Sequence, residues 1–70
     1  MVNIQKLKGK VVEKYNTQSN FTKALGISNP AWTKRTKGIA EFKCSEIEKI
    51  IKLLDLTEEE TFLIFFSEKV

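Results

Sequence analysis

Residues 17–38 hold two short helical patterns separated by a turn of about three residues around one glycine, and this segment constrains the fold more than any other. Thr17 is expected to cap the first helix, because its hydroxyl can accept a hydrogen bond from a first-turn backbone N–H. Gly26 is expected to end that helix, since glycine accepts the left-handed conformation that follows many helices. Ser28 then caps the second helix, with Pro30 in its first turn, where no intrahelical hydrogen bond is lost.

Apolar residues recur at three- and four-residue steps in the rest of the chain, which predicts further short helices. Asn3 is a plausible cap for the N-terminal one. Two capping boxes, S-x-x-E from Ser45 and T-x-x-E from Thr57, mark the starts of two more. Three of the five expected helices span about 3–15, 18–25 and 28–37, and the other two begin at the caps Ser45 and Thr57. Residues 62–67 are apolar enough to end in extended structure. This pattern predicts an all-α fold of five short helices in a single domain over residues 1–70.

Composition removes several classes of function. Seventy residues allow one domain, and a single cysteine excludes an intrachain disulfide. The chain has no histidine, so it lacks the commonest general base and the commonest metal ligand. We therefore expect no enzyme activity, no metal and no cofactor. The N-terminus has no signal-peptide pattern and no stretch is long enough to span a membrane, which predicts a cytoplasmic protein with no membrane partner.

Charge is distributed unevenly along the chain. Residues 1–43 hold nine lysines and arginines against two acidic residues, and residues 44–70 hold three against seven. A basic half can attract phosphate in a salt-dependent way. Solvated helix faces also account for many lysines, so both interpretations stay open on charge alone.

The segment over about 17–38 has the layout of a helix-turn-helix. Phe21, Ala24 and Leu25 on the first helix are expected to face inward. They would meet Ile27 in the turn and Trp32 on the second helix, and this contact would set the crossing angle. The second helix would then stand out from the body and fit a major groove of about 12 Å.

The chain resembles the Cro/CI-type regulators of temperate phages, in particular a small lytic-side group that includes antirepressors called modulators of repression. The resemblance spans nearly the whole chain and rests on five ordered pieces, namely 6–14, Thr17-Gln18, 24–28, 45–50 and 65–70. It implies a five-helix, lambda-repressor-like domain without a cofactor. It also implies a role in choosing between lysis and lysogeny in a bacterial host cell.

This chain departs from that group at the start of its second motif helix. Members that read DNA carry long polar side chains there, whereas this chain has Asn29, Pro30, Ala31 and Thr33. Asn29 alone is a strong base reader by chemistry. The group also tends to have alanine at Thr22 and leucine at Thr36. The helix is thus apolar at its tip and basic at its end, where Lys34, Arg35 and Lys37 follow.

Two functions remain open. In the one narrowly preferred here, the protein is an antirepressor, and a tip formed by Pro30, Ala31 and Trp32 binds the DNA-binding domain of a CI-type repressor. In the alternative, it is a stand-alone Cro-like repressor whose basic helix end grips operator DNA in the major groove. Operator DNA is thus a further possible partner, bound by this protein alone or jointly with the repressor. The candidate contact residues are Gln18, Ser28, Asn29, Pro30, Ala31, Trp32, Thr33, Lys34, Arg35 and Lys37.

Several of these residues also have structural interpretations. Trp32 normally packs in the hinge of such a motif. Cys44 is expected to be a small packing residue, and the acidic run 58–60 is expected to offset a helix dipole rather than hold a metal. The run 62–66 is expected to close the core as a lid, with a seam between two copies of the chain as the alternative; a homodimer is therefore possible.

Overall fold

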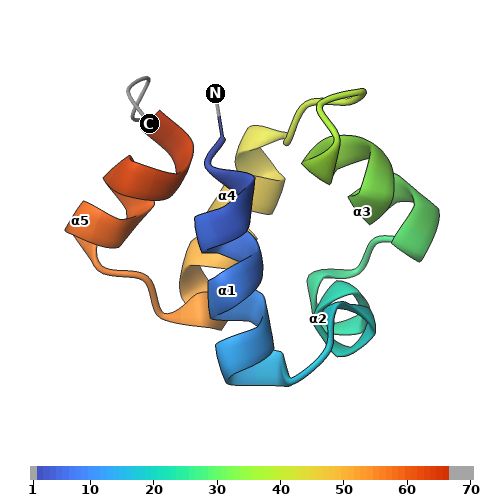
Figure 1. Ribbon diagram of the computed structural model, residues 1–70, viewed down its shortest axis with the longest axis horizontal. Helices are drawn as coiled ribbons and strands as arrows, with labels where there is room; N and C mark the ends of the chain where they lie inside the picture. The colour runs from blue at the N-terminus through green and yellow to red at the C-terminus, as the bar shows by residue number, and fades with distance from the viewer. Residues whose placement is uncertain (1, 67–70) are drawn as a thin grey trace.

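The computed structural model describes residues 2–66. In chain order they form α1 (Ile4–Tyr15), α2 (Gln18–Leu25), α3 (Asn29–Thr36), α4 (Cys44–Leu54), α5 (Glu58–Thr61) and the π-helical turn η1 (Phe62–Phe66), which continues α5 (Figure 1). Within these residues there is no strand. The prediction of an all-α fold built from five short helices is confirmed.

Local capping explains where most of the helices begin. Before α1, α2, α3 and α5 a side-chain oxygen accepts a hydrogen bond from the backbone N–H three residues later, at 3.0–3.2 Å. These caps are the predicted residues Asn3, Thr17, Ser28 and Thr57. Gly26 ends α2 with φ 89°, in the left-handed region where glycine is unstrained.

Two boundary predictions are wrong. Ser45 does not cap α4; the helix begins at Cys44, two residues before the predicted start, and the Glu46 carboxylate accepts a hydrogen bond from the N–H of the capping residue Lys43 at 2.9 Å. The capping box therefore lies two residues before the predicted one, at Lys43 and Glu46. Glu46 also pairs with Arg35 of α3, and this pair fixes the start of the helix. The extended structure expected over 62–67 is replaced by η1 up to Phe66, while Ser67 lies outside the described residues.

The core is a chain of aromatic rings that touches nearly every element. Neighbouring rings meet edge-to-face, with centroids 5.1–6.1 Å apart. The rings belong, in order, to Tyr15, Phe21, Trp32, Phe42 and Phe65. Each such pair adds about 0.5–1.5 kcal/mol beyond the area that it buries. Aliphatic residues of α1, α4 and η1 fill the space around the rings, chiefly Leu7, Val11, Ile50, Leu54 and Ile64.

One predicted core residue is misplaced. Ala24 is exposed on α2, and Thr22 takes the inward position with 2% of its surface exposed. Thr22 can be buried because its hydroxyl lies 3.0 Å from the Ser19 carbonyl oxygen, so its polar atom is satisfied.

The π-helical turn closes the core on the side away from α3 (Figure 1). Ile64 and Phe65 are buried, at 0% and 6% exposure, which confirms the lid over this part of the run. The Ile64 carbonyl oxygen accepts a hydrogen bond from the Asn3 N–H at 2.7 Å, and Lys10 pairs with Glu60 at 2.6 Å. The two contacts join η1 to the N-cap of α1 and α5 to α1 itself.

Candidate recognition surface on α3

Helix α3 presents one face to solvent at the edge of the molecule (Figure 1). The exposed side chains are Asn29, Pro30, Thr33, Lys34 and Lys37, and we call them the α3 face. At 3.6 residues per turn these positions fall within an arc of about 140°. The face is therefore continuous, polar and cationic. Among the described residues, neither of its two lysines forms an ion pair.

Trp32 is not part of this surface. Only 3% of its area is exposed, and its ring lies between Phe21 and Phe42 at centroid distances of 5.4 and 5.8 Å. The structure therefore places the indole in the core, as the packing interpretation predicts. The docking tip of Pro30, Ala31 and Trp32 is not formed, because the third member points inward and Ala31 is half-buried.

Gln18 ties the start of α2 to α3. Its Oε1 accepts a hydrogen bond from the Trp32 Nε1 at 2.5 Å across the motif. The side chain is half-buried. The indole N–H uses one acceptor site of the amide oxygen, and the amide N–H₂ of Gln18 remains able to donate to another molecule.

Asn29 is held by a residue of α2 that the sequence marked only as unusual. Its Oδ1 lies 2.7 Å from the Thr22 hydroxyl, which is also close to the Ser19 carbonyl oxygen. A hydroxyl has one hydrogen, so Thr22 donates to one of these two oxygens at a time. The contact restricts the Asn29 side chain while leaving the residue exposed at the tip of the α3 face.

Arg35 is committed to the interior side of α3. Its Nε donates to Glu46 Oε1 at 2.8 Å and its Nη1 donates to the Ala31 carbonyl oxygen at 3.2 Å. Its side chain is 14% exposed and that of Glu46 12%. Two of its five N–H donors are thus used inside the protein and its charge is paired with Glu46. The role of Arg35 in gripping a phosphate stays a prediction, and such a contact would compete with this ion pair.

Glu46 is a buried carboxylate that the sequence analysis did not single out. Burial acts to raise the pKa of its carboxyl, but the hydrogen bonds from Arg35 and from the Lys43 N–H, with the charges of both residues, outweigh it. The pKa of Glu46 consequently lies below its ordinary value. The S-x-x-E pattern assigned the capping role to Glu48, two residues after the glutamate that performs it.

Lys49 is a second side chain that the sequence analysis missed. Its ammonium donates to the carbonyl oxygen of Leu25, the last residue of α2, at 3.2 Å. Carbonyl groups at a helix C-terminus lack intrahelical partners, and a cation there is favoured by the helix dipole. No local sequence signal identifies this contact, because the two residues are 24 positions apart.

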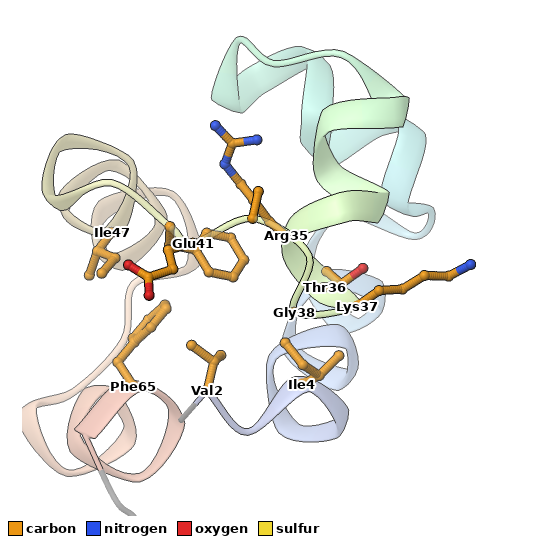
Figure 2. A pocket seen from close by; sticks show the side chains of 11 residues that line it. Val2, Ile4, Arg35, Thr36, Lys37, Gly38, Glu41, Ile47 and Phe65 are labelled. Atoms are coloured by element: carbon orange, nitrogen blue, oxygen red, sulfur yellow. The ribbon is translucent and has the colours of Figure 1, made fainter.

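An open pocket of about 570 Å³ lies beside the C-terminal end of α3. Figure 2 shows the apolar side chains of Val2, Ile4, Ile47 and Phe65 around it, with Lys37 directed away.

Among the described residues no group of three or more acidic or cysteine side chains could hold a metal ion. The predicted packing role of Cys44 is wrong, since this cysteine is exposed.

Residues 1–68 match the family described as "Protein of unknown function (DUF739)". The chain belongs to this family. No curated protein matches it. In this DUF739 protein, no helix of the described residues is long and apolar enough to cross a membrane.

The structure brings together half of the ten predicted contact residues on the α3 face. Ser28 is exposed beside the face, with its hydroxyl engaged as the helix cap. The remaining four, Gln18, Ala31, Trp32 and Arg35, pack or pair inside the motif of the DUF739 protein.

Proposed function

We propose that this protein is a phage genetic-switch regulator on the lytic side that binds operator DNA, as Cro-like repressors do. The observation that supports the proposal is the α3 face, a polar and cationic helix surface whose apolar partner Trp32 is fully used in the core. The protein would act in the cytoplasm of the bacterial host and would need no cofactor.

In this proposal α3 lies in the major groove. The amide of Asn29 would contact a base edge and Pro30 would pack against a thymine methyl group, both from the first turn of the helix. Lys34 and Lys37 would contact phosphates on either side of the groove, which fixes orientation without reading sequence. A single strong base reader predicts modest specificity and a large share of electrostatic affinity.

The antirepressor function is the second candidate, and one observation favours it. Ile39 follows α3 and is 70% exposed, and Pro30 is exposed at the other end of the same helix. Apolar contacts at both ends of a helix suit a protein partner, here the DNA-binding domain of a CI-type repressor. We rank it below DNA binding because Trp32, the residue expected to anchor that contact, is buried.

The deciding experiment is a titration of a fluorescently labelled duplex from the protein's own switch region, followed by anisotropy at about 50 and about 200 mM salt. Operator binding should be saturable and much weaker at the higher salt. Lys34→Gln and Lys37→Gln should each weaken binding to all sequences and lower the salt slope by about one. Lys52→Gln on α4 is the matched control and should bind as the wild type does.

The same assay separates the two candidates. Absence of binding at both salt concentrations would exclude the operator-binding proposal. If the repressor's DNA-binding domain were then bound instead, and Ile39→Ser weakened that complex, the antirepressor function would replace it.

A further inference from the structure

Helix α4 holds both helices of the motif with two charged side chains one turn apart. Glu46 pairs with Arg35 of α3 at 2.8 Å, and Lys49 donates to the last carbonyl of α2 at 3.2 Å. Residues three apart lie on the same side of a helix, so the acidic and the basic group face the motif together. We call Arg35, Glu46 and Lys49 the α4 clamp.

Apart from the clamp, α3 has few attachments to the body. Trp32 is its one buried residue. Two side-chain hydrogen bonds also tie α3 to α2, one from Trp32 Nε1 to Gln18 and one between Thr22 and Asn29. Neither of these hydrogen bonds reaches α4. Arg35 adds the attachment to α4, since it bridges the Glu46 carboxylate and the α3 backbone at Ala31. Guanidinium geometry makes this contact directional.

The turn between the two motif helices is held in the same way. Gly26 permits the left-handed turn, and the Lys49 ammonium lies next to it, where a Cβ added to Gly26 would meet Nζ at 3.6 Å. Lys49 thus fixes the end of α2 from which α3 departs. Together the two clamp contacts restrain both the position of the turn and the rotation of α3.

We propose that Glu46 and Lys49 are positioning residues that set the orientation of the α3 face, and through it the affinity of the protein for DNA. The inference rests on the proposed operator binding. Neither residue would touch the DNA. Their effect would come from holding α3 in the orientation that places its first turn against the base edges.

Helix α4 supplies a matched control for each of its two clamp residues, Glu46 and Lys49. Glu48 and Lys52 are exposed on the same helix, so Glu48→Gln and Lys52→Gln make the same charge changes as Glu46→Gln and Lys49→Gln. Glutamine at 46 also keeps an oxygen that can accept from the Lys43 N–H, which preserves the start of α4.

The clamp variants should lose about tenfold in operator affinity, as expected for residues that act without contacting the ligand. For Glu46→Gln the direction of the change in DNA affinity is diagnostic. Removing a negative charge by itself strengthens binding to DNA, so weaker binding has to come from lost positioning. Glu48→Gln and Lys52→Gln should stay within about twofold of the wild type.

Amide hydrogen exchange of the free protein gives a readout that does not depend on DNA. In Glu46→Gln and Lys49→Gln the amides of α3 should lose more protection than those of α1, whose loss should not exceed the change in the global free energy of unfolding. If Glu46→Gln does not fold, Arg35→Lys takes its place, because it keeps the charge and loses the guanidinium group that bridges Glu46 and the Ala31 carbonyl oxygen.

The outcomes separate the inference from the function. If the wild type binds operator and the clamp variants bind like their controls, the inference is overturned and the function stands. If the wild type does not bind DNA, the proposed function fails. Hydrogen exchange then still decides the clamp, and unchanged exchange in α3 overturns it.

Discussion

Trp32 could either pack in the core or anchor a protein partner, and the structure leaves it free for packing alone. An exposed indole on a helix tip would be a strong anchor for a protein partner. Here the ring closes the contact between Phe21 and Phe42, and its N–H is satisfied by Gln18. The side chain thus has no surface or donor left for recognition, and the α3 face has to work with polar and cationic groups.

Trp32→Ala should destabilise the fold by about 3–5 kcal/mol through loss of buried area and the cavity left behind. That cost is comparable to the whole stability expected for a domain of this size, about 3–5 kcal/mol. We therefore expect a largely unfolded protein in far-UV circular dichroism. Ile39→Ala, at a position 70% exposed, is the control and should melt close to the wild type. A folded Trp32→Ala variant with unchanged melting temperature would contradict the core assignment.

At the scale of elements, the geometry of the motif depends on how α2 ends. Gly26 has φ 89°, whereas Gly9 lies inside α1 with ordinary helical geometry. A Cβ at Gly9 would meet nothing within 4 Å, and one at Gly26 would meet only Lys49 at an ordinary contact distance. Backbone conformation, rather than space, therefore distinguishes the two glycines.

Alanine at these two positions should have opposite effects. Gly26→Ala should destabilise the fold by about 1–2 kcal/mol, because a left-handed conformation is strained for a residue with a Cβ. Gly9→Ala should stabilise it by about 0.5–1 kcal/mol, because glycine is a poor residue inside a helix. Urea denaturation of the two variants measures both. Equal effects of the same sign would show that the turn does not need glycine.

The ion pair between Arg35 of α3 and Glu46 of α4 should make the free energy of unfolding depend on pH. The pKa of Glu46 lies below its ordinary value in the folded state, where Arg35 and the Lys43 N–H hold the charged form. An unfolded glutamate titrates near about 4.3, so the folded state binds fewer protons there. The contribution of Glu46 is therefore present at neutral pH and is lost as the pH falls through its folded pKa.

Urea denaturation between about pH 6 and pH 3 tests this dependence. Glu46→Gln should unfold more easily than the wild type at neutral pH and should lose less stability on acidification. Glu48→Gln, the exposed control on the same helix, should keep the wild-type acid dependence. The pKa of Glu60 is lowered as well, first by its hydrogen bond from Lys10, so part of the dependence should survive in Glu46→Gln. An acid dependence identical in Glu46→Gln and wild type would refute the assignment.

At the scale of the whole molecule, one ring chain connects elements that lie far apart in the sequence. It begins at Tyr15 on α1, passes through Trp32 on α3 and reaches Phe65 on η1. Figure 1 shows α3 and α5 on opposite sides, with α1 and α4 between them. No element has a core of its own, so none is expected to be stable when the others unfold.

Thermal unfolding should therefore be a single transition. Trp32 fluorescence reports on the α3 side of the core, and far-UV circular dichroism reports on all the helices together. The two curves should share one midpoint. A fluorescence midpoint several degrees below that of circular dichroism would show that α3 detaches before the rest of the fold melts.

The sequence alone determined the helices, four of their caps and the turn at Gly26, because these depend on residues within three or four positions of one another. All five residues of the α3 face were among its ten candidate contact residues, together with four that pack or pair inside the protein. Tertiary structure decided which neighbouring side chains were free to act there. Arg35 forms an ion pair with Glu46, and Asn29 is restrained by its contact with Thr22. Lys49 donates a hydrogen bond to the end of α2. Such partners are adjacent only after packing, and no local pattern records which charges packing will bring together.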